Sequence, residues 1–139
     1  MILLDSDHIS TLKYQGTERY RRLVARLATV LDEIVGTTII TVEEQMRGWL
    51  AAIARERQVQ RQIGPYRELG GLFVFFLQFE IVPFEQVAVD HFAQFQRVRI
   101  SSLDRKIAAI AIANDTLLLT ANRRDFEQVP GLKFENWMD

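Results

Sequence analysis

The sequence predicts an α/β domain in which helices cover both faces of a short parallel sheet. Short apolar or β-branched runs alternate with longer segments whose apolar residues recur at helical spacing. Residues 116–120 read Thr-Leu-Leu-Leu-Thr, the continuous apolar run that is typical of a strand buried on both faces. The chain has 139 residues, enough for one domain with a full core, and contains no linker, repeat or low-complexity stretch. We therefore expect one domain over residues 1–139.

The expected elements follow one another along the chain with short connections. Ile2–Leu4 is apolar and stops at Asp5, which indicates a buried strand with a carboxylate at its carboxyl end. Thr41 and Glu44 have the spacing of a capping box, which predicts the start of a long helix there. The other expected elements are helices over 7–12 (capped by Asp7), 18–34 (ended by Gly36), 41–61 (before a break at Gly64-Pro65), 66–79, 85–97 and from Ser101, and strands over 37–40, 81–82, 116–120 and 134–137.

Composition excludes several classes of protein. The chain has no cysteine, so disulfides and thiolate metal sites are excluded. No apolar run is long enough to cross a bilayer, and the N-terminus lacks the pattern of a signal peptide, so we expect a cytoplasmic protein without a membrane partner. A net charge of −1 argues against nonspecific coating of nucleic acid.

Acidic and amide side chains follow the predicted strands. Asp5 comes directly after the first strand, Glu44 shortly after the second, and Asn122 two residues after the strand at 116–120. Ligands of open parallel sheets bind beyond the carboxyl ends of the strands, so we expect these side chains to share one edge. Asp104 joins them if its helix starts at the same edge.

Carboxylates that converge repel one another unless a cation is present. A hard divalent ion such as Mg²⁺ or Mn²⁺ binds oxygen ligands and shares oxygens of a substrate phosphate. The pattern therefore favours metal-dependent phosphate-ester chemistry. The competing interpretation is structural, because Glu44 and Asp104 each stand where a carboxylate would stabilise the first turn of a helix, three residues after Thr41 and Ser101. Asp7 as a helix cap and Asp125 as a turn residue have similarly structural interpretations.

Four segments, in order, resemble the four motifs of PIN-domain proteins, above all the VapC-like toxins of bacterial toxin–antitoxin pairs. The resemblance covers essentially the whole chain. In the second segment the acidic ligand of the family lies four residues before a glycine, which selects Glu44, four before Gly48, over Glu43. The segments are Met1–Ser10 (Met-Ile-Leu-Leu-Asp-Ser-Asp-His-Ile-Ser), Thr41–Gly48, Ser102–Ala111 and Thr120–Leu132.

The resemblance implies a PIN-like α/β/α sandwich and an Mg²⁺- or Mn²⁺-dependent endoribonuclease that hydrolyses RNA with an activated water. Asp5, Glu44 and Asp104 would be the catalytic metal ligands. The resemblance also implies a small VapB-like antitoxin encoded beside the toxin, and a homodimer. The apolar segment 73–77 is a candidate contact surface for such a dimer.

The chain departs from the family at Asn122, where many members have a fourth acid. An amide oxygen can still coordinate the ion or a bound water, and Asp125 is a possible substitute carboxylate. Arg123, Arg124 and Arg105 are candidates for binding RNA phosphates.

Two other functions fit parts of the sequence. An apolar strand followed by Asp5-Ser-Asp7 also begins haloacid-dehalogenase-like phosphatases, in which Asp5 would be phosphorylated, but that family normally has a threonine shortly after the pair, where this chain has His8-Ile9-Ser10. A PIN-like scaffold that binds RNA or protein without catalysis is the second alternative. The retention of three carboxylates argues against it.

Overall fold

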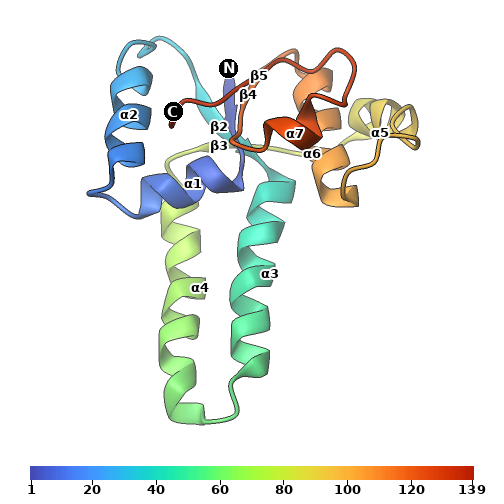
Figure 1. The fold of residues 1–139 in the computed structure, drawn as a ribbon. Helices are drawn as coiled ribbons and strands as arrows, with labels where there is room; N and C mark the ends of the chain where they lie inside the picture. The colour runs from blue at the N-terminus through green and yellow to red at the C-terminus, as the bar shows by residue number, and fades with distance from the viewer.

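A single parallel sheet organises the protein (Figure 1). The computed structural model describes all of residues 1–139. The strand order is β3-β2-β1-β4-β5, and every neighbouring pair is parallel. The strands are β1 (Ile2–Leu4), β2 (Val35–Thr38), β3 (Glu80–Val82), β4 (Leu117–Leu119) and β5 (Phe134–Glu135). The central strand β1 pairs with β2 on one side and β4 on the other.

Helices cover both faces of this sheet, which confirms the predicted α/β/α sandwich. Successive side chains of β1 point to opposite faces, so Leu3 belongs to one buried cluster and Ile2 and Leu4 to the other. The Leu3 face is covered by α5 (Gln86–Ala93) and α6 (Ser102–Ala113), and α6 buries five consecutive residues, Ile107 to Ala111. The opposite face is covered by α1 (Ser6–Lys13), α2 (Glu18–Leu27) and residues of α3 (Ile39–Arg55) and α4 (Ile63–Phe76).

Helices α3 and α4 extend beyond the sheet as a two-helix arm (Figure 1). The short 3₁₀ turn η1 (Val59–Gln62) lies between them. The apolar segment 73–77 lies on α4, and its side chains Phe73 and Leu77 are 62% and 83% exposed in the single chain. No helix, in the arm or elsewhere, has the length and apolar character to cross a membrane.

The structure corrects several predicted boundaries in the first half of the chain. The helix predicted over 18–34 ends at Leu27, and the strand expected at 37–40 is β2, Val35–Thr38. Gly36 is therefore not a helix cap. It lies in β2, where a Cβ atom would stand 2.7 Å from the backbone oxygen of Glu80 in β3.

The caps and ends of the helices also differ from the predictions. Thr38, not Thr41, caps α3, because its Oγ1 accepts the N–H of Thr41 at 3.0 Å. Glu44 is consequently in the second turn of α3 and has no capping role. Helix α3 ends at Arg55, and Pro65 lies in the first turn of α4, where the missing N–H has no helical partner to lose. Helix α5 is shorter than the predicted 85–97.

The Gly36→Ala substitution is expected to destabilise the protein by about 1–3 kcal/mol, because the added methyl group would force β2 away from β3. Gly70→Ala in α4 is the matched control, since a Cβ there meets no atom within 4 Å and alanine favours the helix. Urea unfolding measures both. Equal stability of Gly36→Ala and the wild type would contradict the close packing of the two strands.

Candidate active site

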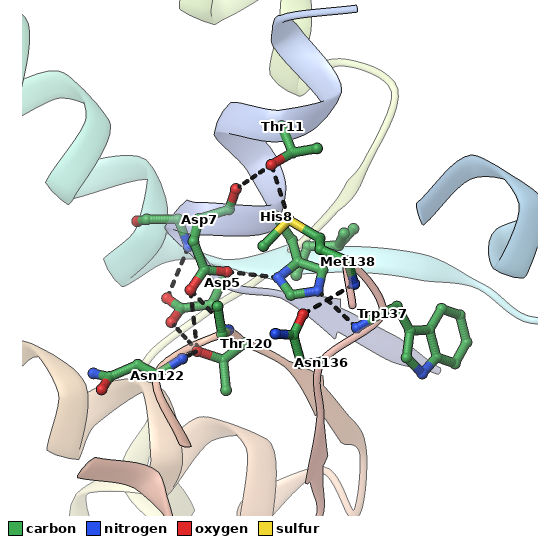
Figure 2. A network of polar contacts seen from close by, with 12 residues as sticks. Asp5, Asp7, His8, Thr11, Thr120, Asn122, Asn136, Trp137 and Met138 are labelled. Carbon is green, nitrogen blue, oxygen red and sulfur yellow. Dashed lines mark hydrogen bonds and ion pairs between the residues drawn. The ribbon is translucent and has the colours of Figure 1, made fainter. Parts of the chain in front are cut away.

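Asp5 is buried at the carboxyl end of the central strand, with 6% of its surface exposed. Its Oδ1 accepts the N–H of Ser6 at 2.8 Å, which makes it the N-cap of α1, and its Oδ2 accepts the hydroxyl of Thr120 at 2.8 Å (Figure 2). Burial, followed by the negative charge of Asp7, raises the pKa of Asp5 to about 7. The carboxylate is thus held firmly in a place that disfavours its charged form.

Glu44 and Asp104 come from different helices and lie in the same electrostatic environment. Burial, followed by the charge of Asp104, raises the pKa of Glu44 to about 6. Asp104 lies in the first turn of α6, where its N–H donates to the Ser101 Oγ at 3.1 Å, as the capping pattern predicted. Burial also raises the pKa of Asp104, with smaller contributions from the charges of Asp125 and Asp7.

The three predicted acids interact in pairs. The charge of Glu44 contributes to the raised pKa of Asp5, and the charge of Asp104 contributes to the raised pKa of Glu44, although the three come from the end of β1, from α3 and from α6. No three acidic or histidine side chains are gathered closely enough to form a complete metal site in the protein alone. The role of these residues as metal ligands stays a prediction.

Glu44 Oε1 and Ser6 Oγ are buried beside this cluster with no other hydrogen-bond partner. The Ser6 hydroxyl faces the Glu44 carboxylate and lowers its pKa, which partly offsets the larger effect of burial. The sequence analysis did not single out Ser6, because only the turn from β1 into α1 brings its hydroxyl beside the acids.

Asp7 is not the cap of α1, which corrects the sequence prediction. Its Oδ2 accepts the N–H of Ala121 at 2.9 Å, and its Oδ1 accepts from His8 Nδ1 at 2.6 Å (Figure 2). Asp7 thereby joins α1 to the turn that follows β4 and carries Asn122. The alternating acids at positions 5 and 7 were the only sequence signal for this link.

His8 is fully buried and connects Asp7 to the C-terminal segment. The N–H of Trp137 donates to its Nε2 at 3.2 Å, so the ring nitrogen Nδ1 holds the proton that faces Asp7. Thr11 adds a second contact, because its hydroxyl lies 2.9 Å from the sulfur of Met138 (Figure 2). The C-terminal residues Trp137 and Met138 are thus bound to α1, the helix that Asp5 caps.

Asn122 stands just before α7 (Arg123–Phe126) and directs its amide toward Asp125. The Nδ2 donates to Asp125 Oδ2 at 3.1 Å, which leaves the amide oxygen of Asn122 without a side-chain partner in this pair. Asp125 lies in α7 and not in a simple turn. Its charge raises the pKa of Asp104, which places it at the border of the acidic cluster.

The three candidate phosphate-binding arginines do not form one patch. Arg105 follows Asp104 in α6, with its guanidinium 5.2 Å from the Phe92 ring centre and its Nε buried without a partner. Arg123 and Arg124 are exposed on α7, and Arg123 forms an ion pair with Asp139 at 3.4 Å. Each of the three adjoins a candidate ligand in the chain, since Arg105 follows Asp104, Arg123 follows Asn122 and Arg124 precedes Asp125.

Comparison with known proteins identifies the family of the chain. The sequence model of the PIN domain matches residues 2–132. A curated relative, the tRNA(fMet)-specific endonuclease VapC of Salmonella typhimurium, is 25% identical over 84 residues, and this match spans 56% of the chain and 64% of that relative's length. The chain therefore belongs to the PIN domain family.

Solved structures with the same fold include two VapBC complexes and FitAcB. DNA-bound VapBC of Salmonella typhimurium matches with a TM-score of 0.73 and 22% identity, over 98% of this chain and 97% of that one. VapBC-1 of nontypeable Haemophilus influenzae matches with a TM-score of 0.79 and 16% identity over 100% of both chains. FitAcB of Neisseria gonorrhoeae matches with a TM-score of 0.72 and 24% identity, over 99% of this chain and 98% of that one. At these identities the likeness establishes the fold alone.

The stability of the metal-free protein is expected to fall as pH rises from about 4 to above 7. In this window folded Asp5, with its pKa raised from 3.8 to about 7, still holds a proton that the unfolded chain has released. Glu44 acts in the same direction. In Asp5→Asn, the fall in the free energy of unfolding across this window should be smaller by an amount on the order of a few kcal/mol. Asp32→Asn, at an exposed position, should leave the fall unchanged. Urea unfolding in EDTA at several pH values measures this, and an unaltered slope in Asp5→Asn would contradict the assigned burial.

Replacement of His8 by leucine is expected to destabilise the protein by about 2–4 kcal/mol, because the N–H of Trp137 and one oxygen of Asp7 would lose their partner. Surface His91→Leu is the control for the change of residue type. Thermal unfolding and limited proteolysis of the C-terminal segment report the effect. A segment that stays protected from protease in His8→Leu would show that other contacts hold it.

Proposed function

We propose that this protein is a metal-dependent endoribonuclease that acts as the toxin of a toxin–antitoxin pair. The strongest support is the electrostatic coupling of Asp5 to Glu44 and of Glu44 to Asp104, three acids from separate elements of a PIN domain. The relative in Salmonella typhimurium is an endonuclease specific for tRNA(fMet), which favours RNA as the class of substrate.

The residues at the site fit Mg²⁺ or Mn²⁺ by their chemistry. All candidate ligands are hard oxygen donors, and burial raises the pKa of Asp5, Glu44 and Asp104, an effect that a bound cation would oppose. Asp5, Glu44 and Asp104 would hold the ion, with Asn122 able to add an amide oxygen. Such an ion supplies positive charge that favours an attacking hydroxide and offsets the charge of the phosphate.

The protein's own groups hold these donors in place. Ser6 N–H and the Thr120 hydroxyl occupy one lone pair on each oxygen of Asp5 and fix the orientation of the carboxylate. Asp7 is a positioning residue, because its contact with Ala121 N–H sets the turn that carries Asn122. Arg105, which follows Asp104 in α6 and whose Nε has no hydrogen-bond partner, is the first candidate for contacting a substrate phosphate.

The proposal includes a small VapB-like antitoxin encoded beside the toxin, since the similar solved structures are VapBC systems. It also includes a homodimer. The exposed apolar side chains of the arm, Phe73, Val74 and Leu77, support a protein contact there, because a contiguous apolar patch of this kind is usually an interaction site.

The direct test compares Glu44→Gln with Glu43→Gln on single-stranded and structured RNAs, with Mn²⁺, Mg²⁺ or EDTA. Glu44→Gln and Asp104→Asn are expected to lower the cleavage rate by at least about a hundredfold. Glu43→Gln, which loses an ion pair with Arg47 and one of the smaller charges that act on Glu44, should cleave nearly as fast as the wild type.

The alternatives give different results in the same assay. Cleavage in EDTA, or equal loss in both glutamate variants, would contradict the assigned site. Mn²⁺ binding without cleavage of any RNA would favour the noncatalytic scaffold. Covalent labelling of Asp5 by an aspartyl-phosphate mimic would favour the phosphatase.

A further inference from the structure

An open groove of about 360 Å³ runs beside the acidic cluster, between α1 and α3. On α3 it is lined by Glu44, Gly48 and Ala52, which recur every four residues and so form one stripe of the helix, and by Arg55 one turn further on. Gln45 crosses toward α1, where its Nε2 lies 3.4 Å from the Ser10 Oγ. The groove thus begins at a predicted metal ligand and leads away along the arm.

The side chains beyond Glu44 are aromatic and cationic. Tyr14 is 55% exposed at the end of α1, and Trp49 faces the same groove from α3. The Lys13 Nζ lies 5.9 Å from the ring centre of each. Neither Lys13 nor Arg55 forms an ion pair with a carboxylate. Lys13 therefore contacts both rings from the edge of the groove, and Arg55 is the cation that lines the groove itself.

We propose that this groove binds an unpaired nucleobase of single-stranded RNA, next to the phosphate that is cleaved. The base would stack on Tyr14 and Trp49, and Lys13 and Arg55 would contact the flanking phosphates. The inference rests on the proposed nuclease function for the position of the scissile phosphate. From Glu44 to Trp49 the helix rises only about 7 Å, so a nucleotide adjacent to the cleavage point reaches both.

Gly48 supports this assignment. Glycine destabilises the interior of a helix, yet a Cβ at this position would meet no atom within 4 Å, so no close packing requires its absence. Because Gly48 has no side chain, the middle of the groove stays open between Glu44 and Trp49. A flat ring needs that space, whereas the fold does not.

The chemistry of the groove favours RNA over a protein partner. A second hollow on the arm, of about 220 Å³, is lined only by apolar side chains, Ile39, Val42, Met46, Leu72, Phe73, Phe76, Leu77 and Ile81. It suits an apolar segment of a partner. The groove at Tyr14 combines two aromatic rings, the guanidinium of Arg55 and the amide of Gln45, groups that recognise bases and phosphates. A duplex is disfavoured, because its bases are already stacked and paired.

The test measures binding of a fluorescently labelled eight-nucleotide RNA of mixed sequence by anisotropy, in EDTA and low salt so that no metal-dependent cleavage interferes. Tyr14→Ala is expected to weaken binding by about tenfold, the loss of one stacked base, while Tyr14→Phe keeps the ring and binds like the wild type. Gly48→Leu should weaken binding to a similar degree by filling the groove, and Gly70→Leu, equally open in α4, should not. Removal of one base from the RNA should weaken binding to the wild type but not further weaken binding to Tyr14→Ala.

The outcomes separate this proposal from the nuclease function. If metal-dependent cleavage occurs but Tyr14→Ala and Gly48→Leu bind RNA like the wild type, the groove assignment is wrong and the nuclease stands. If RNA binding depends on both residues but no RNA is cleaved, the groove is an RNA site and the nuclease proposal fails. The groove assignment is also overturned if the wild type does not bind the RNA, or if Gly48→Leu abolishes binding of an adjacently encoded protein and spares RNA.

Discussion

The burial of one carboxylate, Asp5, at the end of the central strand constrains the rest of the site. The backbone N–H of Asp5 donates to the carbonyl oxygen of Leu119 in β4 at 2.9 Å. The carboxylate accepts the N–H of Ser6 at the start of α1 and the hydroxyl of Thr120, which follows β4. The burial that fixes the group also raises its pKa to about 7. A folded protein keeps such an unfavourable arrangement most readily where function requires it, and a bound cation would relieve it.

A second set of contacts holds the segments around Asp5 in place. Asp7 holds the turn after β4, and His8 passes the connection on to Trp137 near the C-terminus (Figure 2). Segments more than a hundred residues away in sequence therefore hold the N-terminus of α1 in place. Precise placement of catalytic groups depends on such supporting contacts, since small displacements of a donor weaken its action strongly.

The arm formed by α3 and α4 carries two surfaces of different chemistry. One side of α3 continues from Glu44 into the groove with Trp49 and Arg55, and the apolar hollow lies where α3 meets α4. The two surfaces share one helix but use different sides of it, because Val42 and Met46 of the hollow lie two residues from Glu44 in each direction.

The sequence by itself determined the order of strands and helices and the buried β1 and β4, because apolar periodicity is a local property. Motif spacing also predicted three acids, Asp5, Glu44 and Asp104, as the site, and the pairwise coupling of their charges agrees with that prediction. It misplaced the start of α3 at Thr41, since Thr38 and Thr41 are equally good caps and only pairing of β2 with β1 and β3 decides between them. It also assigned Asp7 to a cap and missed Ser6 and the role of His8. Their partners, Ala121 and Trp137 among them, lie far along the chain. These groups meet only when the strands have paired into the sheet, and their burial then determines which polar atoms have a hydrogen-bond partner.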